Sequence, residues 1–184
     1  MTCDYYESDE RMVKKELFNE IAEMEVKKWI KAEMIEKAQK ALEEGNLEVA
    51  KKTLDKIKTT ASSQIRKYYD EVQRYRRRLE RITGGEKEEK KMFRAFLPAI
   101  KMIRAKVMYA KARGVVTDDF VAFFNKHLSY LESEDDVNKF RIFCRYFESI
   151  LGFYKYYEEL KENLMKEVNQ ALREKKKRQA YIRR

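Results

Sequence analysis

The sequence has 184 residues, of which 40% are charged, five are glycine and one is proline. Turns, hairpins and sandwiches need many more glycines and prolines, so this composition excludes most β folds. It predicts an all-α protein, a compact bundle of five to six helices with a long C-terminal helix. The formal net charge of +10 indicates a polyanionic partner.

Two helices are predicted at the start of the chain. Apolar residues recur at helical spacing over residues 12–44, which predicts a long helix that Gly45 ends. Asn46 is expected to cap a short helix over residues 47–58. Together these elements are predicted to form an N-terminal helical hairpin extension, residues 1–58.

The middle of the chain predicts two longer helices. Ser62 or Ser63 is expected to cap the third helix, which ends at the Gly84-Gly85 loop. A fourth helix is predicted over residues 86–114, with acidic side chains in its first turn and basic ones in its last turn, as the helix dipole favours. Pro98 is expected to kink or restart this helix, because proline lacks the backbone N–H.

The last two helices begin at clear capping signals. Thr117, followed by two aspartates, is expected to cap a fifth helix. Ser133 and Asp136 have the spacing of a capping box and begin a sixth helix, predicted over residues 135–177. At 1.5 Å per residue this helix would be about 60 Å long.

The sixth helix carries a heptad-like apolar seam that only Lys161 interrupts. The seam can pack inside its own bundle or against a second copy, and both interpretations stay open. Weak self-association is expected through this seam or through the N-terminal hairpin. The bundle core is predicted to span residues 59–172, and a basic tail residues 173–184. The seam consists of Phe140, Phe143, Phe147, Ile150, Tyr154, Tyr157, Leu164, Val168 and Ala171.

Residues that usually carry catalysis or bind metals are scarce. His127 is the one histidine, and a structural or surface role is expected for it. Cys144 lies beside the apolar seam and is expected to be a buried, inert thiol, far in sequence from Cys3. Phosphate-loop, serine-hydrolase and zinc-protease motifs do not occur. The sequence therefore predicts no catalytic residue, no metal and no cofactor.

The same features predict where the protein works. Two cysteines are too few for a disulfide framework. No apolar run approaches the length of about 18 residues that a membrane helix needs, and the first ten residues do not resemble a signal peptide. We therefore expect a cytoplasmic protein that makes no membrane contact.

Basic residues are concentrated after residue 60. Residues 1–60 carry 12 basic and 14 acidic groups, whereas residues 90–114 carry eight basic groups and no acidic one. Arginine and tyrosine also mix in the third helix, around Arg66, a pattern typical of proteins that bind single-stranded RNA. A purely solubilising role is the alternative. On a helical projection the basic residues of the fourth helix form two flanks, one with Arg94, Lys101, Arg104 and Lys111, the other with Lys106 and Arg113.

Three phrases on these helices, in this order, resemble the small subunit of the type III-A CRISPR Csm effector complex. The first is TASSQIRKYY at residues 60–69. The second is LPAIK at residues 97–101, which runs on to YAKARG at residues 109–114. The third is FESILGFYKYY at residues 147–157. The resemblance covers residues 59–160.

This resemblance implies a helical subunit without a nuclease centre, present in several copies. The copies stack head to tail beside the backbone subunits that hold the crRNA, and touch the large polymerase-like subunit at one end. The subunit holds the crRNA-target RNA duplex and the target strand without reading their sequence. The matching motifs imply that Arg66, Lys101, Lys111 and Arg113 bind RNA. The helical projection adds Arg104 on the flank of Lys101, and Lys139, Arg141 and Arg145 on the face of the last helix away from its seam.

Two other functions fit part of the pattern. A helical protein-protein adapter or assembly factor would bind its partner through the N-terminal hairpin and use the basic face only for solubility. A DNA-binding regulator would need a short recognition helix for the major groove, whereas the basic helices here are long and amphipathic.

Overall fold

The computed structural model describes residues 5–7 and 12–182, and its regular secondary structure there is all helical. One isolated antiparallel bridge joins Tyr6 and Val13. A π-helical turn, η1 (Leu17–Ile21), precedes the first α-helix, and a 3-10 turn, η2 (Glu134–Asp136), precedes the last. The all-α class and the long C-terminal helix are confirmed. The α-helices are α1 (Ala22–Ile30), α2 (Ala32–Glu43), α3 (Leu47–Asp55), α4 (Ser62–Glu80), α5 (Gly85–Ala112), α6 (Asp118–Ser129) and α7 (Val137–Ile182).

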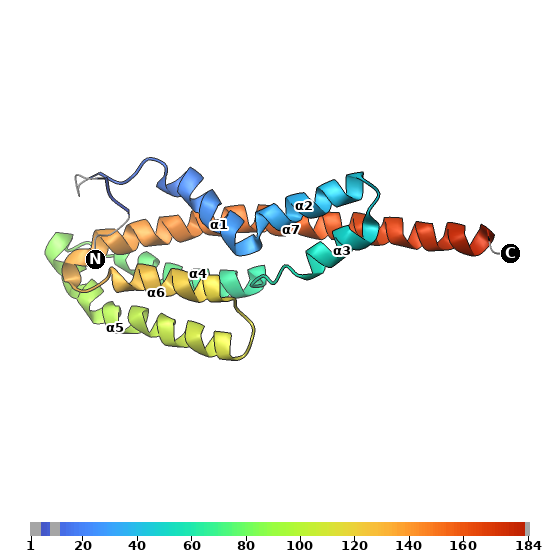
Figure 1. Ribbon diagram of the computed structural model, residues 1–184. Coiled ribbons are helices and arrows are strands. Elements are labelled where there is room, and N and C mark those ends of the chain that lie inside the picture. The colour runs from blue at the N-terminus through green and yellow to red at the C-terminus, as the bar shows by residue number, and fades with distance from the viewer. Residues whose placement is uncertain (1–4, 8–11, 183–184) are drawn as a thin grey trace.

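Helix α7 is the axis of the molecule. It has 46 residues, which makes it about 70 Å long at 1.5 Å per residue, and in Figure 1 it runs nearly from end to end. Helices α1, α3 and α4 pack against it, and α2 pairs with α3. Helix α5 packs mainly on α6 and α4 and forms the outer layer at the bottom of Figure 1. One long side of α5 is therefore left to solvent.

The apolar seam of α7 is buried inside the molecule. Phe143 and Phe147 are fully buried and lie against the rings of Phe123 and Phe124 from α6. Trp29 from α1 meets the ring of Phe123 edge-on, with 5.1 Å between ring centroids. Of the two interpretations of the seam, packing within its own bundle is correct. Self-association through the seam is wrong, because its side chains are already covered.

The segment between α3 and α4 is fixed by polar contacts within this core. The Tyr154 hydroxyl donates to the Thr60 carbonyl, and the Thr60 and Thr117 hydroxyls lie 3.0 Å apart. Lys161, the polar residue of the seam, donates from Nζ to the Ile57 carbonyl at 3.0 Å, and its burial lowers the pKa of its ammonium. Because the buried residues of the hairpin and of the bundle form one cluster, the two parts share a single core.

The predicted starts of the later helices are correct to within about two residues, whereas helical structure near the N-terminus begins at Leu17 and not at residue 12. Most of the expected caps form no side-chain hydrogen bond. Ser133 and Asp136 form the expected capping box. The Asp136 carboxylate loses solvation on burial, but hydrogen bonds from Lys139 and from two backbone N–H groups outweigh this cost and lower its pKa. Helix α4 begins at Ser62, whose N–H donates to the Glu158 carboxylate of α7 at 3.2 Å, so a tertiary contact replaces the side-chain cap. Thr117 occupies its N-cap position without a side-chain capping bond.

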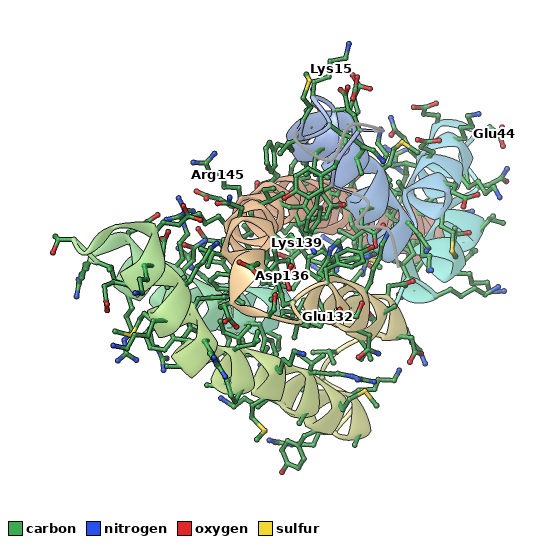
Figure 2. The ribbon with its side chains drawn as sticks, turned by 90° about the vertical axis from the view of Figure 1, so that its left-hand side faces the viewer. Lys15, Glu44, Glu132, Asp136, Lys139 and Arg145 are labelled. Carbon is green, nitrogen blue, oxygen red and sulfur yellow. The ribbon has the colours of Figure 1, made fainter. Side chains whose placement is uncertain are left out.

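The predicted fourth helix continues through Pro98 without a restart, as α5. Its ribbon bends part-way along in both views (Figures 1 and 2). Proline removes one hydrogen bond and crowds the preceding turn, so a bend is the expected way for the helix to continue.

The predicted single helix over residues 12–44 is wrong, because Lys31 breaks it into α1 and α2. Lys31 has the left-handed conformation (φ 57°, ψ 53°) and is the non-glycine residue with positive φ among those described. The break lets α1 pack on α7 while α2 pairs with α3, which one straight helix could not do. This packing offsets the steric cost of a side chain in the left-handed region, about 1–2 kcal/mol.

Replacing Lys31 by glycine is expected to raise the free energy of unfolding by about 0.5–1 kcal/mol, because glycine has no Cβ to strain the left-handed conformation. The lost contact from Lys31 Nζ to Asp119, at 3.4 Å and half-exposed, contributes little. The control is Lys28→Gly, in the last turn of α1, which should lower stability by about 1 kcal/mol. Urea unfolding curves measure both. If Lys31→Gly loses as much stability as the control, Lys31 does not have the left-handed conformation that separates α1 from α2.

Candidate nucleic-acid interface

The basic residues of α5 lie on two flanks that face different neighbours. On the α6 side, Arg104 Nε donates to Asn125 Oδ1 at 2.8 Å, and Lys111 Nζ lies 2.8 Å from Asp118 Oδ2. On the α4 side, Lys106 forms an ion pair with Glu71. These contacts agree with the two flanks of the helical projection, since side chains seven residues apart lie on the same side of a helix.

Between the flanks, the outward face of α5 is apolar or small. Met102 and Tyr109 are 56% and 65% exposed, and the side chains of Pro98, Ala105 and Ala112 are exposed as well. Cations therefore border an uncharged strip along the solvent side of the helix. Such a surface offers phosphates a row of charges and offers bases an apolar contact.

A groove of about 460 Å³ lies where the start of α4 meets the end of α5. Lys67 lines it from α4, and Lys106 and Arg113 line it from α5. The guanidinium of Arg113 lies 5.8 Å from the centroid of the Tyr109 ring, one helical turn before it. Tyr68 forms part of the inner wall, where its hydroxyl donates to the Lys106 carbonyl at 3.0 Å.

Some of the predicted RNA-binding residues already form ion pairs with carboxylates of the same chain, and others do not. Lys139 lies 2.7 Å from Asp136, Arg141 pairs with Glu89, and Lys111 pairs with Asp118. Five of the eight are exposed and form no ion pair with any residue that the structure describes, and one of these five, Arg104, donates to a neutral amide. The other four are the unpaired cations. The unpaired cations can meet a phosphate without losing an internal partner. They are Arg66, Lys101, Arg113 and Arg145.

The eight residues do not form one patch. Lys101, Arg104 and Lys111 lie on α5 and Arg113 is its C-cap residue, while Lys139, Arg141 and Arg145 lie in the first turns of α7. Figure 2 shows Asp136 and Lys139 together at the end of the bundle, with Arg145 projecting from another side. Glu89, the partner of Arg141, is 24 residues before Arg113 on α5, or about 35 Å along the helix. Arg66 is the one residue of the eight that lies on α4.

Of the residues that line the groove, only Arg113 was among the predicted site residues, and Lys67 and Tyr109 are two of those that were missed. Lys67 is one of several basic residues of its helix, and no local pattern distinguishes it from the others. Tyr109 falls outside the apolar stripe of Ile103, Val107 and Ala110, all of which are buried. Its position off this stripe is the signal by which the sequence alone identifies an outward-facing tyrosine.

His127 and Cys144 belong to the core. The His127 side chain is 5% exposed, and its Nδ1 lies 2.6 Å from the Tyr5 hydroxyl. Cys144 is fully buried, as expected, and burial raises the pKa of its thiol. Cys3 lies outside the described residues. Within the described residues, no three His, Cys, Asp or Glu side chains gather as a metal site would require, and no helix is long and apolar enough to cross a membrane.

A family model described as Csm2 Type III-A matches residues 36–160. The chain belongs to the Csm2 family. It is thus a small subunit of the type III-A Csm complex of CRISPR systems, and the resemblance of the three sequence phrases is confirmed. No curated protein and no solved structure matches the chain.

The extent of the Csm2 match adds one correction. The resemblance began at residue 59, whereas the family model begins at residue 36, within α2. Helix α3 and most of α2 are therefore part of the family region. The segment before residue 36 and the second half of α7 lie outside the match.

Proposed function

We propose that this chain holds the crRNA-target RNA duplex and the target strand in the Csm complex through sequence-independent phosphate contacts, and that it has no catalytic role. Members of its family are generally structural subunits of that complex. The observation that carries the proposal is the acid-free stretch 90–114, which the fold places on the outermost helix of the bundle. The RNA-binding residues proposed are the eight predicted from the sequence, of which the four unpaired cations are proposed to contribute most of the affinity and the three residues in ion pairs the least.

The physical argument rests on the spacing and exposure of the cations. Phosphate contacts position a protein on RNA but carry no sequence information. Lys101 on α5 and Arg113 at its C-cap lie 12 residues apart, about 18 Å along the helix, which spans several phosphates of a strand. The proposed protein partners are the backbone subunit, the large polymerase-like subunit and further copies of the chain, in the cytoplasm. The basic tail, exposed over residues 173–181, is proposed to add phosphate contacts.

The wild-type chain is expected to bind unrelated single-stranded RNAs with similar affinity. Its affinity should fall steeply with salt, because each neutralised phosphate of a single strand contributes a slope of about −0.7 in log K against log salt. Fluorescence anisotropy titrations at several salt concentrations measure both properties. Strong sequence preference, or a slope near zero, would overturn the proposal and favour the adapter function, in which the basic face only keeps the protein in solution.

A further inference from the structure

The groove between α4 and α5 combines an open aromatic ring with cations. Tyr109 is 65% exposed although it lines the groove, so much of its ring is open to solvent. Arg113 holds its guanidinium near the same ring. Lys67 and Gln64 line the groove from α4. An exposed tyrosine at this place is not explained by the fold, since the ring buries little against the protein.

We infer that this groove binds one unpaired nucleotide of an RNA strand, with its base stacked on Tyr109 and its phosphate between Lys67 and Arg113. The inference rests on the proposed RNA-holding function and adds to it a site that distinguishes single strands from duplex. Bases stack on aromatic rings regardless of sequence, because every base has a π face. The Gln64 amide can donate to or accept from a base edge.

The charges of the groove suit a phosphate. None of the described residues that line the groove is acidic, and Glu71, which pairs with Lys106 of the groove wall, is 8% exposed. Neither Lys67 nor Arg113 forms an ion pair with a described residue; each lies near a tyrosine ring instead, at 5.7 Å from Tyr68 and 5.8 Å from Tyr109. The positive charges of both side chains are therefore not compensated by a carboxylate of the protein and can attract a phosphate.

A base in a duplex has both faces covered by its neighbours, so only an unpaired base can reach the Tyr109 ring. The groove volume of about 460 Å³ lies within the range of sites that hold small ligands, roughly 300–1,000 Å³. A duplex would contact the cations at the rim and leave the ring free. The ring and the cations should therefore make separable contributions to binding.

The test compares Tyr109→Ala, Tyr109→Phe and the control Tyr156→Ala, a 61% exposed tyrosine of α7. Anisotropy titrations use an unstructured oligouridine and a duplex RNA of equal length. Tyr109→Ala should weaken binding of the single strand between about 5-fold and 100-fold and change duplex binding less than 2-fold. Tyr109→Phe and Tyr156→Ala should bind both RNAs as the wild type does.

Photocrosslinking with 5-iodouridine in the same oligonucleotide provides a second measurement, with the modified peptide identified by mass spectrometry. The adduct is expected on the peptide that contains Tyr109. If Tyr109→Ala binds the single strand like the wild type, or if the adduct forms elsewhere, the nucleotide site is wrong while the proposed function still stands. If the wild type shows no salt-dependent RNA binding, the proposed function itself fails.

Discussion

Replacing Phe147 by alanine is expected to lower the free energy of unfolding by about 3–5 kcal/mol, the usual cost of removing a phenylalanine from a packed core. The side chain is fully buried on α7 at the level where α4 and α6 meet it. The loss combines the transfer of the ring to water with the cavity it leaves, since its neighbours belong to rigid helices and can collapse only in part. The rings around it are those of Tyr69, Phe120, Phe123, Phe124 and Phe143, with centroids 5.4–6.5 Å away.

Urea unfolding followed by far-ultraviolet circular dichroism measures this loss. Tyr156→Ala is the control, because it removes an aromatic ring from the same helix at an exposed position and should change stability by less than about 0.5 kcal/mol. If Phe147→Ala does not fold, Phe147→Leu gives a smaller loss at the same site. Equal stability of Phe147→Ala and Tyr156→Ala would contradict a core centred on the α7 seam.

Removing the unpaired cations is expected to weaken RNA binding by about a hundredfold at 0.1 M salt. The variant carries Arg66→Ala, Lys101→Ala and Arg113→Ala. Three lost phosphate contacts reduce the slope of log K against log salt by up to about two units. Wild type and variant are expected to bind equally near 1 M salt, so their affinities differ by about two orders of magnitude at 0.1 M. All three side chains are exposed and alanine favours helix, so helical content should not change.

The matched control removes three cations that are already paired. It carries Lys111→Ala, Lys139→Ala and Arg141→Ala, whose partners are Asp118, Asp136 and Glu89. The same formal charge is lost, but these groups would have to leave a carboxylate before meeting a phosphate, so the slope should change by less than about one unit. Equal effects of the two triple variants would mean that overall charge, not a located surface, controls binding.

The features that the sequence predicted correctly are those that depend on local periodicity. The flanks of α5 follow from a spacing of 3.6 residues per turn, and the contacts of Arg104 and Lys111 with α6 agree with it. The start of α7 follows from the capping box of Ser133 and Asp136, a motif defined by two residues three positions apart in the sequence. The pattern alone identified a seam in α7 but not the partner that covers it.

Other features depend on contacts between distant segments. The break at Lys31 carries no local signal, since lysine is a good helix former and tertiary packing alone favours the left-handed conformation there. The pairing of Arg141 with Glu89 joins residues 52 apart, so a helical projection of α7 shows Arg141 as a free cation. The groove at Tyr109 exists only because the start of α4 meets the end of α5.

The central claim is that this subunit holds RNA within its complex. Purification of the tagged full-length chain from its host at moderate salt, with RNA sequenced and proteins identified in the eluate, tests this claim most directly. We predict that crRNA and the other Csm subunits copurify, and that the unpaired-cation variant recovers the same proteins with less target RNA. Recovery of the wild-type chain with protein partners but without crRNA or target RNA would contradict the account and support a protein-protein adapter.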